Sequence, residues 1–224
     1  MKNTLQHDNS SKSKSDEFNN FIIESQHPCL MALSMAKKKL LSVGEYGNIT
    51  EEKSIIELAD DLLIFINEVS KNSSQLMSYV AIFDTPRFCD ERKFEEYLWR
   101  ALKSLNSKDN TPWSCSVSCN PLSKKFSFSY GGEAFFIVGM HPNASRLARK
   151  APHLTLVFNL HEQFESLRKN GTFEKIRNSI RKRDRKLQGS VNPMLANYGK
   201  STEAVQYSGR QVGSNWKCPV AFPA

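Results

Sequence analysis

Three of the five histidines in the chain fall within residues 138–164, together with several basic side chains. His141 and His161 lie near the two ends of this stretch, with Arg146 and Arg149 between them. Imidazole acts as a metal ligand or as an acid–base group, and guanidinium pairs with carboxylates and phosphates. These residue types fit a metal site, a cofactor pocket, a phosphate or nucleic-acid patch, or an ordinary charged loop.

The two histidines occupy positions that can present a ligand. His141 follows an expected buried strand and precedes Pro142, which disfavours helical geometry and holds the backbone extended. His161 falls in the first turn of an expected helix, where the helix dipole favours the neutral ring. Taken singly, each position is more often an ordinary loop or helix-end histidine. Because both follow strands, we expect them to face one cavity.

The positive charge of the chain is local. The formal net charge is +8, and residues 141–187 hold twelve Lys or Arg against four Asp or Glu. A basic surface of this kind indicates an anionic partner. Nucleic acid is the less favoured partner, because the basic run at 177–186 lacks aromatic residues for base stacking and no nucleic-acid motif precedes it. Within the same helix Arg183 and Asp184 flank the apolar stripe, as an ion pair or as part of a pocket wall.

Several classes of site are excluded or weakened by the sequence. There is no Walker A motif, dinucleotide-binding glycine pattern, H-E-x-x-H or G-x-S-x-G. The five cysteines accompany no export signal, so we expect reduced thiols, and the C-x3-C pair Cys115 and Cys119 makes zinc a minor alternative. No apolar run is long enough to span a membrane, which predicts a soluble, cytoplasmic protein.

The elements that must position these side chains follow from hydrophobic periodicity and turn residues. We expect helices over 28–43, 54–70, 90–105, 160–170 and 173–188, strands over 76–84 and 154–160, and a hairpin over 125–140 that turns at Gly131 and Gly132. Gly44 and Gly47 should end the first helix. Asp90 is the expected N-cap of the third, Asn159 with Glu162 resembles a capping box, and Thr172 can cap the last.

This order of elements predicts an α+β fold with a mostly antiparallel or mixed sheet flanked by helices. Residues 1–20 are polar and predict a disordered or frayed tail, followed by a single domain over 21–224. From about residue 189 the chain is rich in Gly, Ser, Asn and Pro. We expect a long, irregular C-terminal segment there, of the kind that often forms a functional lid or wrap.

The second half of the chain resembles the YqcI/YcgG family. The similarity is carried by four strings: "FSFSYGGEAFFIVGMHPNASRLARK", "LVFNLHEQFESLR", "IRKRDRKLQGSVNPMLANYGKSTEAVQYSGR" and "WKCPV". With weaker similarity elsewhere, the match covers most of residues 27–220. The chain departs from the family pattern at Val220, which stands where phenylalanine is usual.

The resemblance implies a heme-dependent N-hydroxylase of guanidino groups, as in the guanitoxin and D-cycloserine pathways. The cofactor would be heme b (iron protoporphyrin IX), and the whole of 21–224 would be the heme-binding domain. His141 would be the axial iron ligand, with Arg146, Arg149 and Arg210 as cations for the cofactor. His161 is the next candidate ligand or a distal catalytic group, and Cys218 ranks third.

The same resemblance implies a small guanidino or amine substrate such as L-arginine, dioxygen, and an electron-donor reductase. Glu162, Asp184 and Glu203 are the acids expected to meet the cationic substrate, with Asp184 as a catalytic group. Arg210 would also suit the α-carboxylate of an amino acid. The alternatives are a non-catalytic heme-binding or gas-sensing protein and, less favoured, a basic nucleic-acid-binding module. A homodimer is one form that the assembly can take.

Overall fold

The computed structural model describes residues 12–71, 76–84, 89–195 and 200–223. Its centre is a five-stranded sheet with the order β1-β2-β5-β4-β3. The strands are β1 (Leu41–Asn48), β2 (Ser78–Asp84), β3 (Phe128–Tyr130), β4 (Glu133–Met140) and β5 (Leu154–Leu160). β1 runs parallel to β2, and every other neighbouring pair is antiparallel. The sheet is therefore mixed.

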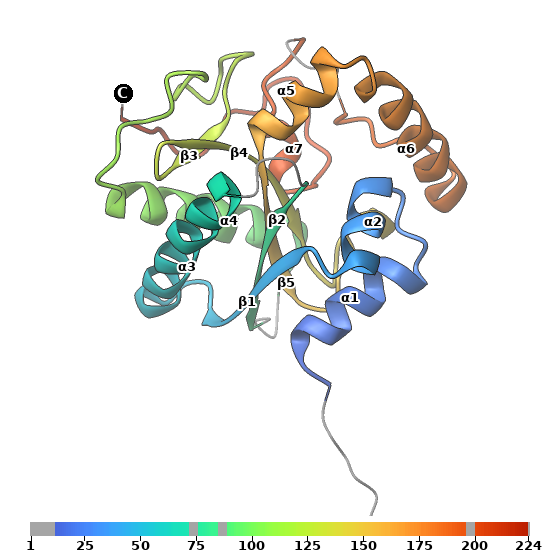
Figure 1. Ribbon diagram of the computed structural model, residues 1–224, viewed down its shortest axis with the longest axis horizontal. Coiled ribbons are helices and arrows are strands. Elements are labelled where there is room, and N and C mark those ends of the chain that lie inside the picture. Colours follow the sequence, from blue (N-terminus) through green and yellow to red (C-terminus); the bar gives the residue numbers. More distant parts are fainter. Residues whose placement is uncertain (1–11, 72–75, 85–88, 196–199, 224) are drawn as a thin grey trace, which may run out of the picture.

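Helices cover both faces of this sheet (Figure 1). The described residues form α1 (Lys14–Glu24), α2 (Leu30–Lys38), α3 (Glu52–Lys71), α4 (Glu91–Lys108), α5 (His161–Lys169), α6 (Phe173–Gln188) and α7 (Ala204–Tyr207). The larger hydrophobic core joins α3 and α4 to one face, and a smaller core joins α1 and α2 to the other. α6 packs beside α2 on that second face. The predicted α+β class is confirmed.

The alternation of side chains along β4 decides which face each site residue meets. Phe135 and Ile137 belong to the core under α3 and α4. Val138 and Met140 belong to the smaller core on the opposite face, and the alternation places Phe136 on that face as well, although its ring also contacts the larger core. The neighbouring strand β5 follows the same rule, so Asn159 shares a face with Phe136.

The predicted hairpin and the two predicted strands are confirmed. Gly131 and Gly132 have φ values of +58° and +78°, the left-handed conformation that a tight two-residue hairpin turn requires. The last predicted strand matches β5 residue for residue, and β2 begins two residues later than predicted.

β1 was not predicted from the sequence. The first helix was expected to continue to residue 43, but α2 ends at Lys38, and Lys39 takes a left-handed conformation at its C-cap. Gly44 lies within the strand that follows and does not end a helix. A side chain at that position would collide with the hydroxyl groups of Tyr46 and Tyr79, which meet above the strand. The glycine there serves packing against a tyrosine pair.

A helix occupies part of the segment that was predicted as an N-terminal tail. α1 begins at Lys14, capped by the Ser13 side chain, and it buries Phe18 and Ile22 against the sheet. The expected frayed segment over 1–20 is therefore wrong for its last seven residues. Of the remainder of that prediction, residues 1–11 lie outside the described residues.

The helix caps gave mixed results. Asp90 caps α4 as predicted, because its side chain accepts a hydrogen bond from the backbone N–H of Lys93. The predicted capping box at Asn159 is wrong: this residue lies inside β5, where its side chain accepts from Ser78 and donates to the Phe136 carbonyl. Thr172 occupies the N-cap of α6, but its side chain makes no capping hydrogen bond.

The C-terminal part of the chain is long and irregular, as predicted. Gly189 ends α6 in a left-handed conformation, and the only helix that follows in the described residues is the four-residue α7. This segment returns across the sheet near β4. In the described ranges, no helix combines the length and apolar character needed to cross a bilayer.

Candidate functional site

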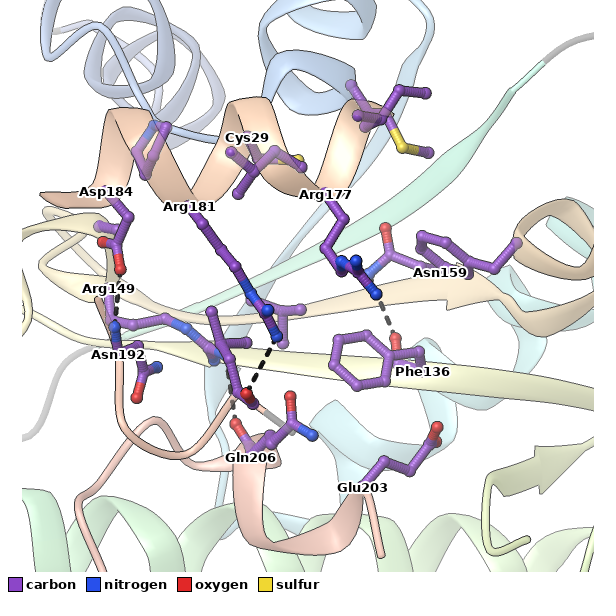
Figure 2. Close-up of a pocket in the computed structure, with 18 of the residues that line it drawn as sticks. Cys29, Phe136, Arg149, Asn159, Arg177, Arg181, Asp184, Asn192, Glu203 and Gln206 are labelled. Atoms are coloured by element: carbon purple, nitrogen blue, oxygen red, sulfur yellow. Dashed lines mark hydrogen bonds between the residues drawn. The ribbon is translucent and has the colours of Figure 1, made fainter. Parts of the chain in front are cut away.

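A cavity of about 300 Å³ lies between the sheet and α6 (Figure 2). Its volume is at the low end of the range of small-molecule sites. Figure 2 shows side chains of α6 reaching in from one wall, with Glu203 and Gln206 opposite. The polar residues around it include Lys124, Asn159, His161, Arg168, Arg177, Arg181, Asp184, Asn192, Glu203 and Gln206.

The floor and one wall of the cavity are apolar for simple geometric reasons. The floor consists of the even-numbered residues of β4, Phe136, Val138 and Met140. The wall belongs to α6, where Phe173, Ile176 and Ile180 recur at the helical repeat and so share one face. Phe164 of α5 joins this wall. A flat, apolar ligand would therefore find hydrophobic contact on two sides.

Three arginines line the cavity from α5 and α6. Arg177 and Arg181 are four residues apart, so they project from the same face of α6. Arg181 donates to the Leu195 carbonyl at 3.3 Å, which ties α6 to the C-terminal segment. Arg168 pairs with Glu165 and lies 4.6 Å above the Phe173 ring. This concentration of guanidinium groups suits an anionic ligand, in particular one with carboxylates.

His161 lines the cavity with a buried ring, as does His27. It is the first residue of α5, its exposed fraction is 7%, and its Nε2 lies 3.3 Å from Glu165 Oε1. Burial lowers the pKa of this imidazole below its usual range. The neutral ring expected from the sequence is supported, although burial is its largest cause. A neutral, buried imidazole beside an apolar wall is suited to bind a metal centre.

Glu203 is a buried carboxyl group on the opposite wall. Its Oε1 accepts hydrogen bonds from the Ser127 and Tyr207 hydroxyls, each at 2.6 Å. Burial raises the pKa of Glu203 to about 7, although those two hydrogen bonds and the positive charge of Arg168 oppose the shift. This carboxyl group can accept or donate a proton close to neutral pH.

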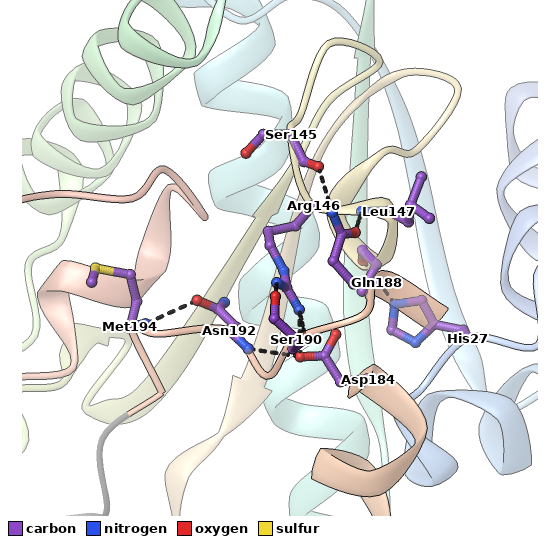
Figure 3. Close-up of polar contacts among 10 residues, drawn as sticks. His27, Ser145, Arg146, Leu147, Asp184, Gln188, Ser190, Asn192 and Met194 are labelled. Atoms are coloured by element: carbon purple, nitrogen blue, oxygen red, sulfur yellow. Dashed lines mark hydrogen bonds and ion pairs between the residues drawn. The ribbon is translucent and has the colours of Figure 1, made fainter. Parts of the chain in front are cut away.

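Asp184 and Arg146 form an ion pair in the cavity wall (Figure 3). Arg146 Nη2 lies 2.6 Å from Asp184 Oδ2, and the same guanidinium donates to the side chain and the carbonyl of Ser190. Asp184 Oδ2 also accepts from the backbone N–H of Asn192 at 2.9 Å. The pair therefore fastens the end of α6 to the loop after β4 and to the start of the C-terminal segment.

The guanidinium group of Arg149 donates hydrogen bonds to backbone carbonyl groups. It donates to the carbonyls of Gly139, Tyr207 and Gln206 at 2.8, 3.3 and 3.2 Å. Burial lowers the pKa of its guanidinium to about 10. These contacts join β4 to α7, so Arg149 supports the wall that carries Glu203.

His141 lies outside the cavity. Its side chain is 1% exposed and stacks on Phe94 of α4, with ring centroids 4.5 Å apart. It continues the odd-numbered face of β4, which is the face opposite the cavity. The expectation that His141 and His161 share one cavity is therefore wrong.

Two further predicted site residues also lie elsewhere. Arg210 pairs with Glu95 of α4 and borders a separate, open depression that includes Cys89 and Asn143. Glu162 is exposed and does not line the cavity; its charge helps to raise the pKa of Glu133. Cys218 packs against the core under α3 and α4.

The cavity thus brings together five of the eight predicted site residues: His161, Asp184, Glu203, Arg146 and Arg149. The sequence interpretation missed His27, Asn159, Arg168, Arg177 and Arg181. A signal for Arg168 was present, because it follows His161 by seven residues and so lies on the same face of a helix. No group of three or more His, Cys, Asp or Glu side chains within the described ranges is arranged to hold a metal ion.

Comparisons with known proteins agree with the family resemblance. The model of the YqcI/YcgG family matches residues 18–221. The chain is 27% identical over 211 residues to the uncharacterized protein YcgG of Bacillus subtilis (strain 168), a match that covers 87% of this chain and 81% of that protein. No solved structure was found to match the chain. Because the family model spans most of its length, the chain belongs to the YqcI/YcgG family.

Proposed function

We propose that the protein binds heme b in this cavity and N-hydroxylates a guanidino group of a small amino acid or amine, such as L-arginine. Dioxygen and external electrons from a reductase would be the co-substrates. The observation that carries the proposal is the placement of the neutral, buried imidazole of His161 beside apolar walls and a group of arginines. Family membership adds to it, through the resemblance of the chain to heme-dependent N-hydroxylases.

The residues of the cavity fit a heme in chemical type. His161 would supply a nitrogen ligand to the iron, and the floor of Phe136, Val138 and Met140 would meet the apolar macrocycle. Two of the three cavity arginines would suffice for the two propionates. Since the cavity volume is only about 300 Å³, binding of a porphyrin would require the cavity walls to move apart. When bound, the heme would supply the binding and activation of dioxygen.

The remaining side chains would handle the substrate. Of the acids that line the cavity, Asp184 is paired with Arg146, so Glu203 would receive the guanidinium group or take up a proton from it. A cavity arginine not used by the cofactor would meet the α-carboxylate of an amino acid. The Arg146–Asp184 pair would hold the wall in place without contacting the reacting atoms, because its members are already bonded to each other.

A second candidate function is a heme-binding or gas-sensing protein without hydroxylase activity. The small volume of the cavity favours it, since a porphyrin would leave little room for an amino acid. The nucleic-acid alternative loses support, because Arg177 and Arg181 of the basic helix turn toward the cavity.

Product analysis separates the two main candidates. Reduced holoprotein is incubated with dioxygen, a reductase system and a panel of guanidines and amines, and the products are examined by mass spectrometry. The hydroxylase proposal predicts that one substrate gains one oxygen atom, and that Glu203→Gln lowers the yield while heme content is retained. Heme binding with no oxygenated product across the panel would leave the sensor.

A further inference from the structure

Three aromatic residues form a continuous chain from the outside of the protein to the wall of the cavity. Trp216 in the C-terminal segment is partly exposed, and its ring centroid lies 6.2 Å from that of Trp99 in α4. Trp99 stacks on Tyr207 of α7 with centroids 5.5 Å apart and ring planes inclined by 18°. Both inner rings are almost completely buried. An electron can therefore cross this distance in two short steps.

The inner end of the chain reaches the cavity through two contacts. The Tyr207 hydroxyl donates to Glu203 Oε1 at 2.6 Å, and Glu203 lines the cavity. The Tyr207 ring also meets the edge of Phe136, part of the cavity floor, with centroids 5.8 Å apart. A redox group in the cavity would thus lie next to a phenol that is hydrogen-bonded to a carboxylate.

The chemistry of these side chains suits one-electron transfer. Tryptophan and tyrosine are the aromatic side chains that lose an electron most readily. A tyrosine must release its phenolic proton as it does so, and Glu203 is a base in hydrogen-bonding contact. The indole Nε1 of Trp99 is buried with no hydrogen-bond partner among the described residues. An oxidised Trp99 would therefore keep its proton as a cation radical and pass the electron vacancy to a neighbour.

We propose that Trp216, Trp99 and Tyr207 form a one-electron relay between the protein surface and the cavity, with Glu203 as the proton acceptor for Tyr207. The proposal rests on the proposed function for the identity of its inner partner, a redox cofactor in the cavity. The outer partner would be a soluble reductant of the thiol or ascorbate class, at Trp216.

One cycle of the relay conserves atoms and electrons. A one-electron oxidant in the cavity takes an electron from Tyr207 and is reduced, while the phenolic proton moves to Glu203 Oε1. Trp99 then gives an electron to the tyrosyl radical, which recovers its proton from Glu203, and Trp216 gives an electron to Trp99. The external reductant restores Trp216 and is itself oxidised by one electron.

Packing alone does not explain the inner pair. Phenylalanine is the commonest aromatic residue of this core, as at Phe94, Phe126 and Phe135. Tyr207 and Glu203 instead place a hydroxyl and a carboxyl group in a buried site, which costs stability relative to apolar residues of similar size. The raised pKa of Glu203 reflects this cost of burial.

The relay can be tested from its outer end, without any heme. Light and a persulfate quencher generate tris(bipyridine)ruthenium(III) in solution with the apoprotein, at a pH above the pKa of Glu203. Freeze-quenched samples are then examined by electron paramagnetic resonance. The relay predicts a tyrosyl radical that disappears in Tyr207→Phe, Trp99→Phe and Trp216→Phe. In Glu203→Gln the signal should change to that of a tryptophanyl radical.

Trp113→Phe is the matched control, because Trp113 contacts Phe126, Phe128 and Phe222 but is not part of the chain. It should keep the wild-type tyrosyl signal. Circular dichroism and thermal melting verify that each variant folds. Because Trp216 is partly exposed, Trp216→Phe interrupts the relay without disturbing the buried core. A wild-type protein with no Tyr207 radical, or a signal that survives both tryptophan substitutions in the relay, overturns the proposal. Neither result depends on whether heme binds.

Discussion

His141 and His161 lie at opposite ends of two adjacent antiparallel strands and on opposite faces of the sheet. Met140, the last residue of β4, pairs with Thr155 near the start of β5, whereas Leu160 at the end of β5 pairs with Phe135 near the start of β4. Two residues that each follow a strand are therefore separated by the length of the strands. This relationship places His161, but not His141, in the cavity and gives His141 a role in packing.

The packing role predicts that His141→Ala lowers stability but not cofactor binding. The substitution removes a ring that stacks on Phe94 in a fully buried position, and large-to-small changes of this kind cost about 2–4 kcal/mol. Urea unfolding should show this loss in the free energy of unfolding, while heme binding at fixed protein concentration stays at the wild-type level. Loss of heme binding by a folded His141→Ala protein would show that the histidine acts on the cofactor.

Because Arg146 and Asp184 form a buried ion pair, we expect the loss of either partner alone to lower the free energy of unfolding strongly. Asp184→Asn leaves a buried guanidinium without its counter-charge, which costs roughly 3–5 kcal/mol when one member of a buried pair is removed. The double variant Arg146→Met/Asp184→Leu should recover most of this loss in urea unfolding. If Asp184→Asn abolished product formation at wild-type stability, Asp184 would instead be a catalytic residue.

Glu203 predicts that the folded protein loses stability as the pH rises. Its pKa is raised from 4.5 to about 7 in the folded state, so the unfolded chain releases this proton first. The contribution to stability is fully present below pH 4.5 and is lost between there and about pH 7, a change of roughly 3 kcal/mol. Denaturant unfolding across this range should show a smaller loss for Glu203→Gln than for the wild type. If the free energy of unfolding fell equally with pH in both proteins, the Glu203 carboxyl group would be in a solvated site.

For His27 we expect the opposite dependence of stability on pH, with stability lost as the pH falls. Its Nε2 donates to the Ala148 carbonyl and its Nδ1 accepts from the Cys29 N–H, so both nitrogens are used by the neutral ring. Burial lowers the pKa of His27 to about 4 from 6.5. Its contribution is therefore present above pH 6.5 and is lost as the pH falls toward 4, again by roughly 3 kcal/mol.

His27→Gln provides the measurement for this second pH effect. The variant should lose less stability than the wild type between pH 6.5 and 4, because it has no proton to take up on unfolding. His153→Gln is the control, since that ring is partly exposed and pairs with Glu17. The account fails for His27 if the two variants and the wild type lose stability in parallel.

Local features of the fold were predictable because local chemistry decides them. The turn at Gly131 and Gly132, the cap at Asp90 and the strand over 154–160 depend on few neighbours in the chain. β1 was missed because Gly44 was interpreted as the end of a helix. In the structure, this glycine makes room for the hydroxyl groups of Tyr46 and Tyr79, and Tyr79 belongs to another strand. Such a tertiary requirement cannot be read from the local sequence.

The site was predictable in its residue types but only partly in its composition. His161, Asp184 and Glu203 do line the cavity. The sequence could not show that Arg146 and Arg149 are taken up by an ion pair and by backbone carbonyls, because those partners lie far along the chain. It also could not place Arg210 beside Glu95, since that contact depends on the path of the irregular C-terminal segment.

The most direct test of the central claim is the absorption spectrum of His161→Ala protein after heme addition, measured beside wild type and His141→Ala. The account predicts a Soret band typical of histidine-ligated heme in the wild type and in His141→Ala. In His161→Ala the band should revert to that of unligated heme, and added imidazole should restore it. A wild-type protein that binds no heme, or an unchanged Soret band in folded His161→Ala, would contradict the account.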